Sequence, residues 1–180
     1  IFTYNKVLKN YIVALNRVIE GGYKKDNELP DPSVPAGMNV NVSNFHSWAF
    51  LFLREHGNNL TDRTIRKADR FGLIQRIKGK YSATNNVANK AVQFFDEEFV
   101  WMKGKMYISE SLYIDNPRTG RGTVDRITTK DKHVIWQMFD EYNAELRKAN
   151  LVDFDDYAIL CYQELEKNPD QKVYLYNTEL

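Results

Sequence analysis

Three aspartates stand close together in the stretch LVDFDDYAIL (151–160), and carboxylates at this density can bind a divalent metal or act as an acid and base pair. The same residues also suit the start of a helix. Asp153 precedes an apolar helical pattern and Asp156 follows three positions later, which is the spacing of a capping box. Asp155 and Asp156 would favour the positive end of the helix dipole. We therefore predict a helix cap here, with a metal-dependent nuclease built on the three aspartates as an alternative.

The other residue types that commonly catalyse reactions form no recognisable pattern. The histidines at 46, 56 and 133 are not at metal-ligand spacing. The single cysteine, Cys161, lies within an apolar helical pattern, so we expect a buried thiol, no internal disulfide and a reducing, cytoplasmic environment. The glycines of TGRGT (119–123) lack the Gly-Lys-Ser/Thr ending of a phosphate-binding loop. We predict neither a catalytic nor a metal site in this chain.

Two segments are locally basic, although the whole chain is balanced at 25 basic and 24 acidic residues. Residues 63–80 carry one acid, Asp69, against a row of basic residues: Arg63, Arg66, Lys67, Arg70, Arg76, Lys78 and Lys80. The loop NPRTGRGTVDRITTKDK (116–132) is also rich in arginine and lysine. Basic residues beside glycines can approach phosphates closely, and the alternative is that they are solvated surface.

Short strands and helices are expected to position these groups. A β-prone run at the start leads into helical spacing over 5–19, with Asn5 as its candidate cap. After a loop rich in glycine and proline, residues 38–45 alternate like a strand and 46–57 read as a helix stopped by Gly57. Two strand-to-helix units in succession suggest the edge of an α/β sheet.

From Thr61 onward the pattern is helical, with Pro117 and two glycines marking a loop. We expect helices near 61–79, 84–103, 128–149 and 153–167. No run of about 18 apolar residues could span a bilayer, so a membrane partner is not expected.

Four stretches in this order resemble parts of a superfamily I DNA helicase of the UvrD, PcrA and Rep type. FTYNK (2–6) is similar to the end of the motif Ia strand, and SNFHSW (43–48) to the TFHS element, with Asn44 where the family often has threonine. TGRGT and VIWQMFDEYNAELRKANLVDFDD (134–156) resemble the later part of the inserted helical subdomain. The resemblance covers most of the chain and is loosest over 58–100.

The resemblance implies an α/β, predominantly helical fold: a partial RecA-like P-loop NTPase core holding an all-helical insertion. The core would comprise 1–57 and 151–180, and the insertion 58–150. The chain lacks the Walker A lysine, the Walker B acids and the arginine finger, so we expect no ATP hydrolysis by this chain alone. ATP and Mg would act in the intact parent, an ATP-dependent helicase from which this internal segment is taken.

The partners implied are single-stranded DNA, the duplex junction and the remaining helicase domains of the parent. The resemblance puts two sets of residues on the single-strand track: Thr3, Tyr4, Asn5 and Lys6, then Asn44, Phe45 and His46. Tyr4 and Phe45 could stack on bases, and the polar members could hydrogen-bond phosphate or sugar. Core packing is the alternative for the two rings. Three loop arginines are candidates for duplex or junction phosphates: Arg118, Arg121 and Arg126.

A rival interpretation from another class is a helical protein-interaction module of helicase ancestry without motor activity. It would use exposed aromatic residues as anchors for a protein partner, with Trp101, Tyr107 and Tyr113 as the candidates. Their burial therefore bears on this alternative.

Overall fold

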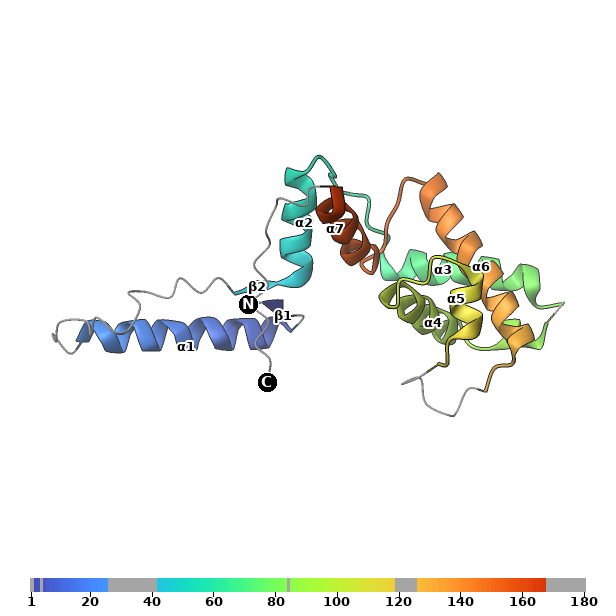
Figure 1. Cartoon of the computed structure of the whole chain (residues 1–180), viewed down its shortest axis with the longest axis horizontal. Helices are drawn as coiled ribbons and strands as arrows, with labels where there is room; N and C mark the ends of the chain where they lie inside the picture. The colour runs from blue at the N-terminus through green and yellow to red at the C-terminus, as the bar shows by residue number, and fades with distance from the viewer. Residues whose placement is uncertain (1, 4, 26–41, 84, 119–125, 168–180) are drawn as a thin grey trace. The chain divides into compact units, whose positions relative to one another are not determined.

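Helices make up most of the described structure of this protein, as the sequence predicts (Figure 1). The computed structural model describes residues 2–3, 5–25, 42–83, 85–118 and 126–167. The chain forms two compact units, Ile1–Asn59 and Leu60–Leu180, and each is described by itself.

In the first unit, two short parallel strands each lead into a helix. Strand β1 (Phe2–Thr3) pairs with β2 (Ser43–Asn44), with Phe2 opposite Ser43 and Thr3 opposite Asn44. Helix α1 (Lys6–Lys25) follows β1 and helix α2 (Phe45–Glu55) follows β2. The two predicted strand-to-helix units are therefore present. The strand expected over 38–45 is described only at its end, because 38–41 lie outside the described residues.

Helix α1 is longer than the sequence predicts. We expected a loop from Glu20, but the helix continues through Gly21 and Gly22 to Lys25. Glycine lowers helix stability by about 1 kcal/mol relative to alanine, yet it keeps its backbone N–H and can continue the hydrogen-bond ladder, which proline cannot. The end of α2 agrees with expectation, since Gly57 has a φ of 82° and its N–H donates to the carbonyl of Arg54.

The second unit is a helical body with a short parallel bridge between Thr64 and Val152. Its helices are α3 (Lys67–Tyr81), the 3-10 helix η1 (Asn86–Asn89), α4 (Val92–Gly104), α5 (Glu110–Asp115), α6 (Thr129–Lys148) and α7 (Asp156–Lys167). The expected helix 61–79 begins later because Thr64 is bridged and Asp62 has a φ of 60°. The expected helix 84–103 is divided into η1 and α4.

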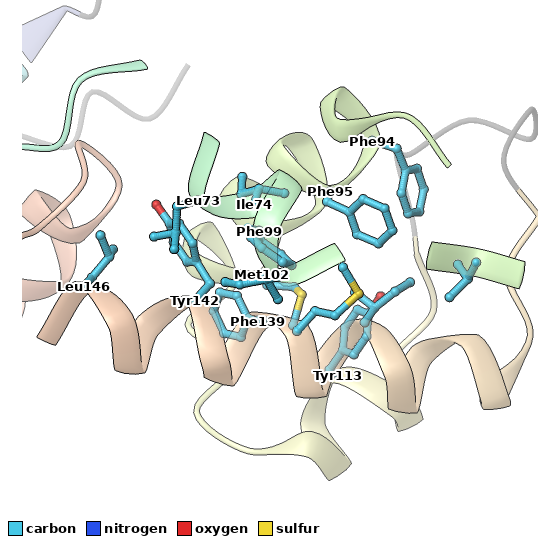
Figure 2. Close-up of a cluster of buried hydrophobic side chains, with 14 of the residues drawn as sticks. Leu73, Ile74, Phe94, Phe95, Phe99, Met102, Tyr113, Phe139, Tyr142 and Leu146 are labelled. Carbon is cyan, nitrogen blue, oxygen red and sulfur yellow. The ribbon is translucent and has the colours of Figure 1, made fainter. Parts of the chain in front are cut away.

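The core of this unit lies between α3, α4 and α6, where side chains from the three helices interlock (Figure 2). Phe99 of α4 is fully buried, and its ring centroid lies 5.4 Å from that of Phe139 and 5.3 Å from that of Tyr142. Phe95 and Met102 extend the same face of α4 and are also fully buried. Each such side chain contributes about 1.5–3 kcal/mol through burial, so this aromatic layer fixes how α4 packs on α6.

Helix α5 is short, and side chains from neighbouring helices hold it in place. The Lys132 ammonium of α6 donates to the backbone carbonyls of Tyr113, Ile114 and Asn116 at 3.0, 2.8 and 2.8 Å. These carbonyls stand at the end of α5, where the helix itself supplies no donors. Lys132 therefore caps α5 from outside.

We expect Phe99→Ala to lower the free energy of unfolding of the second unit by about 3–5 kcal/mol, since it removes a fully buried ring and leaves a cavity. Urea denaturation followed by circular dichroism measures this change. The neighbouring Val100 is 39% exposed, so Val100→Ala serves as the control and should stay within about 0.5 kcal/mol of wild type. Equal effects of the two substitutions would contradict the packing described here.

Candidate nucleic-acid interface

The two strands of the first unit end side by side, and this brings two distant sequence motifs together. Thr3 and Asn44 are register partners at the carboxyl ends of the parallel strands. Helix α2 begins directly after Asn44, and helix α1 begins at Lys6, three residues after Thr3. Ligands of open α/β sheets bind outside the carboxyl ends of their strands. The FTYNK and SNFHSW motifs therefore meet at the edge where a ligand is expected.

An asparagine caps each of these two helices. The Asn5 Oδ1 accepts from the backbone N–H groups of Val7 at 2.8 Å and Leu8 at 3.3 Å. The Asn44 Oδ1 accepts from the N–H of His46 at 3.1 Å. The predicted cap at Asn5 is confirmed. Both amide groups were predicted DNA contacts, and in the structure their carbonyl oxygens are engaged within the protein.

Aromatic rings continue from this edge along α2. Phe45 lies edge-on to His46, with centroids 5.7 Å apart, and 6.1 Å from Trp48. Trp48 stacks on Phe52 at 5.0 Å, and Phe52 contacts His56 at 4.3 Å. Phe45, His46 and Trp48 are half-buried. Trp48 was not among the predicted site residues, although its position three residues after Phe45 on a helix would have indicated it.

The remaining predicted contacts have different surroundings. Lys6 is exposed at the start of α1, and Thr3 ends strand β1. Tyr4 and Arg121 lie outside the described residues. Arg126 is exposed.

Arg118 makes an ion pair inside the helical body. Its Nη2 lies 2.5 Å and its Nε 2.9 Å from the two carboxylate oxygens of Glu98, which is fully buried. The same carboxylate accepts from the Tyr113 hydroxyl at 2.8 Å. Arg118 thus compensates a buried charge and fixes the start of the basic loop. Any phosphate would have to compete with Glu98 for this guanidinium.

The rings proposed as protein-binding anchors pack in or against the core. Tyr113 is fully buried. Trp101 and Tyr107 are partly buried against the same cluster, with ring centroids 5.4 Å apart. They therefore stabilise the fold at the junction of α4 and α5, while Trp101 and Tyr107 keep part of their surface exposed.

The aspartate cluster at 153–156 forms the predicted capping box. The Asp153 Oδ1 accepts from the backbone N–H groups of Asp155 at 3.0 Å and Asp156 at 3.1 Å. In return, the Asp156 Oδ2 accepts from the N–H of Asp153 at 2.9 Å. These reciprocal bonds satisfy the first amide groups of α7.

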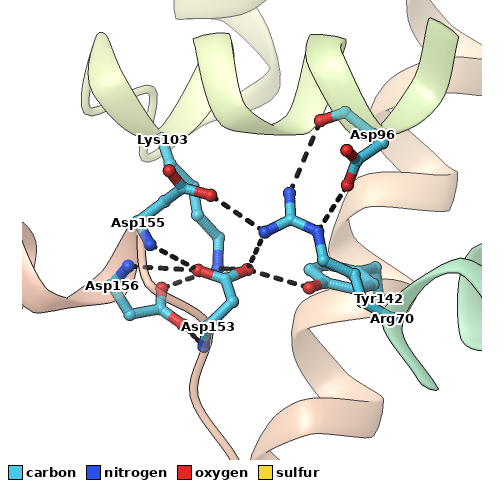
Figure 3. A network of polar contacts seen from close by, with 7 residues as sticks. All are labelled: Arg70, Asp96, Lys103, Tyr142, Asp153, Asp155 and Asp156. Atoms are coloured by element: carbon cyan, nitrogen blue, oxygen red, sulfur yellow. Dashed lines mark hydrogen bonds and ion pairs between the residues drawn. The ribbon is translucent and has the colours of Figure 1, made fainter. Parts of the chain in front are cut away.

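The same carboxylates also belong to a buried ionic network that the local sequence does not indicate (Figure 3). The Lys103 ammonium lies 2.8 Å from Asp153 Oδ2 and 2.6 Å from Asp156 Oδ1. The Tyr142 hydroxyl donates to Asp153 Oδ2 at 2.8 Å. Asp153 is 1% exposed and Lys103 is 4% exposed. The network therefore joins α4 and α6 to the residues that open α7.

Arg70 connects α3 to this network. Its Nη1 lies 2.9 Å from Asp155 Oδ2 and 3.4 Å from Asp153 Oδ2, and its Nε lies 2.5 Å from Asp96 Oδ1 on α4. Arg70 and Lys103 also lie over the Tyr142 ring, at 5.7 and 5.4 Å from its centroid. Both cations therefore gain from the ring face as well as from the carboxylates.

The network shifts the pKa values of its two central carboxyl groups in opposite directions. Burial alone would raise the pKa of Asp153, but Lys103 and Arg70, with the hydrogen bonds from Lys103 and Tyr142, hold it below its usual value. Burial and the negative charge of Asp153 raise the pKa of Asp156. The first carboxyl group is thus the ionised centre of the network.

This arrangement gives the aspartates a structural role. Among the described residues, no group of three histidine, cysteine or carboxylate side chains is arranged to hold a metal ion. The three carboxylates are instead paired with the Lys103 ammonium and the Arg70 guanidinium. In the part of the chain that the structure describes, no helix combines the length and apolar character needed to cross a bilayer.

Comparison with known proteins places this chain in a family of helicase domains. The family model of the UvrD/REP helicase N-terminal domain matches residues 13–178. The chain therefore belongs to the UvrD/REP helicase N-terminal domain family, as its motifs suggest. The match includes SNFHSW and LVDFDD and begins after FTYNK. No match was found among curated proteins or among solved structures.

We expect Lys103→Met to destabilise the second unit by about 3–5 kcal/mol, because it leaves the Asp153 charge buried with too few partners. Chemical denaturation provides the measurement. Lys105→Met removes an exposed lysine two residues away and should cost less than about 0.5 kcal/mol. In a double-mutant cycle, Lys103→Met with Asp153→Asn should cost less than the sum of the single changes. Additive costs would refute the network.

The network also predicts a defined dependence on pH. Since the folded pKa of Asp153 is lowered, its stabilisation is complete above the unfolded value of about 3.9 and is lost as the pH falls through the folded value. Asp153→Asn preserves a capping oxygen and removes the charge. The difference in unfolding free energy between wild type and Asp153→Asn should therefore shrink below about pH 4.

Asp156→Asn provides the opposite test, because the folded pKa of Asp156 is raised. A proton is then held more tightly in the folded state, so wild type should gain stability relative to Asp156→Asn as the pH falls. Urea titrations over a series of pH values measure both differences. Parallel pH profiles for the two variants would contradict the assignment.

Proposed function

We propose that this chain is the DNA-contacting part of an ATP-driven superfamily I helicase that moves along single-stranded DNA and separates duplexes. It would comprise part of a RecA-like first motor domain, 1–57 and 151–180, and a helical insertion, 58–150. ATP and Mg would be bound by the rest of the parent protein, and a cytoplasmic location belongs to the same proposal. Membership of the UvrD/REP helicase family supports this function.

The observation that carries the proposal is the pairing of β1 with β2. It brings the ends of two motifs, about forty residues apart, to one sheet edge with Thr3 opposite Asn44. A strand of DNA crossing that edge would meet both motifs in succession. Lys6 offers a charge for phosphate, and the N-termini of α1 and α2 favour negative groups.

Base stacking would come from the aromatic side of this edge. Phe45 is half-buried, and it rests on Trp48 and against His46. A ring supported in this way loses little side-chain freedom when a base stacks on it. Stacking contacts every base in the same manner, so the expected binding is independent of sequence. His46 would supply a hydrogen bond to phosphate or sugar beside the stacked base.

An exposed row of apolar residues on α1 supports the proposal that this chain packs against further domains of a parent protein. Val7 is 76% exposed and Tyr11 is 60% exposed, and Leu8 and Leu15 follow at helical spacing. Apolar side chains repeated on one helix face normally pack against another element. The remaining motor domains are the proposed cover for this face.

The loop arginines form the less direct part of the proposal. Arg121 and Arg126 are proposed contacts for phosphates at the duplex junction. Arg118 would act through its ion pair with Glu98 by holding the start of the loop, as well as by any direct contact.

Titration of a labelled single-stranded oligonucleotide, followed by fluorescence anisotropy at two salt concentrations, tests the function. Phe45→Ala with His46→Ala should reduce affinity by about 5- to 150-fold, the equivalent of one stacked base at about 1–3 kcal/mol. Wild-type binding should weaken steeply with salt because phosphate contacts release counterions.

The matched control is Phe50→Ala with His56→Ala, which removes the same residue types further along α2. Circular dichroism establishes that both double variants remain folded. Equal loss of affinity in the two variants would contradict the predicted track, and so would wild-type binding that does not respond to salt.

A further inference from the structure

A cavity of about 420 Å³ lies between α6, α7 and the turn that joins α4 to α5. Tyr107, Trp136 and Phe139 contribute aromatic rings to its walls, and α7 adds the aliphatic side chains of Ile159 and Leu160. Cavities that bind small organic molecules have volumes of about 300–1,000 Å³ and are lined mostly by such side chains. This cavity belongs to the second unit, whereas the proposed DNA track belongs to the first.

The rim of the cavity exposes apolar side chains to water. Ile108 is 84% exposed and Met106 is 40% exposed, and both line the cavity. Met106 also has a φ of 51° where α4 ends, and its N–H donates to the carbonyl of Lys103 at 2.8 Å. Glycine is the usual residue at this left-handed position, and a residue with a side chain is strained there. Exposed apolar surface beside a hollow is typical of a place where another molecule binds.

One carboxylate that lines the cavity is accessible. Asp156 and Lys103 both line it and form an ion pair at 2.6 Å, but the Asp156 side chain is 22% exposed and the Lys103 side chain only 3%. The Asp156 Oδ1 accepts from Lys103, and its Oδ2 accepts from the N–H of Asp153 at 2.9 Å. A carboxylate offers about four acceptor positions. Asp156 can therefore accept a further hydrogen bond from a molecule in the cavity.

The charges around Asp156 do not balance. In the described part of the chain, the buried network joins two cations, Arg70 and Lys103, to a larger set of carboxylates. These carboxylates belong to Asp96, Asp153, Asp155 and Asp156. Where α6 lines the cavity, Asp140 and Arg147 lie 4.0 Å apart and offset each other. The cavity thus combines apolar walls with an excess of negative charge at Asp156.

We propose that this cavity binds a small organic ammonium compound, that is, an amine with an apolar ring or chain. The apolar body contacts Tyr107, Trp136 and Phe139, and the ammonium group donates to the Asp156 carboxylate. Such a charge-assisted hydrogen bond is stronger than a neutral one, and it adds positive charge where the network has too little. Aromatic ring faces near the ammonium group add to the attraction. This site requires no nucleic acid and goes beyond the proposed function.

Ligands of other charge fit the cavity less well. A carboxylate or phosphate compound would meet the excess negative charge beside Asp156. A neutral hydrocarbon would fill the apolar space, but it would cover the Asp156 carboxylate without offering a donor, and covering a charge in this way is costly. A metal ion would leave the apolar walls exposed. An apolar amine satisfies both the walls and the carboxylate.

Three indoles with the same ring system and different charge test the proposal: tryptamine, 3-ethylindole and indole-3-propionate. Isothermal titration calorimetry with the full chain measures their affinities, and the indole N–H signal of Trp136 in NMR spectra locates the site. Tryptamine should bind with a Kd of about 1 mM or tighter, and about tenfold or more tightly than the other two, because only its ammonium group donates to Asp156. The Trp136 signal should shift during the titration.

Asp156→Asn removes the charge and keeps an oxygen that can accept from the N–H of Asp153. It should weaken tryptamine binding about tenfold or more and abolish the preference over indole-3-propionate. Asp140→Asn is the matched control, since this carboxylate is 70% exposed, and it should change the affinity by less than about twofold. Asn143 lines the cavity from α6, so Asn143→Trp should fill it and remove tryptamine binding.

Circular dichroism establishes which variants remain folded, and the comparison of the three indoles on wild type decides the outcome for any variant that does not. The proposal is overturned if wild type fails to bind tryptamine at about 1 mM, or if the three indoles bind equally. Unchanged affinity in folded Asn143→Trp, or equal losses in Asp156→Asn and Asp140→Asn, also overturns it. The single-stranded DNA titration is independent, so failure of either proposal leaves the other standing.

Discussion

The buried ion pair between Lys103 and Asp153 is the interaction on which the helical unit depends. Neither charge could be buried alone, because the cost of removing an ion from water exceeds what packing returns. Tyr142 and Arg70 complete the hydrogen bonding of the carboxylate, so one group receives contacts from three helices. The start of α7 is consequently fixed by charge as well as by its cap. An apolar substitute could fill the space, but it would not specify the same angle of approach.

In the first unit, strand pairing brings together residues that are far apart in the sequence. Its described sheet consists of two short strands, yet the parallel register is enough to bring two motifs to one edge. An asparagine at each strand end turns the chain into a helix and uses its side chain to satisfy the new helix terminus. The polar residues of the candidate track therefore shape the backbone at the same place where they would meet a ligand.

Local features could be predicted from the sequence, and distant contacts could not. The capping box at Asp153 and Asp156 follows from spacing within one turn, and the cap at Asn5 follows in the same way. The partner of Asp153 is Lys103, fifty residues away, and no local pattern marks it. Arg118 was predicted from its charge to contact DNA phosphates, and in the structure it forms an ion pair with Glu98. The loop predicted from Glu20 was wrong, because α1 continues through Gly21 and Gly22. Glycine keeps the backbone N–H that the helical hydrogen bonds need, whereas proline lacks it.

The position of this network in the chain has a consequence for the order of folding. Asp155 lies 85 residues beyond Arg70, so their contact closes a long loop, and loop closure costs entropy before any contact is made. The cost falls when the intervening helices have already packed and hold Arg70 and Lys103 in place. We therefore expect α7 to dock late, onto a preformed helical body, so that weakening the network accelerates unfolding more than it slows folding.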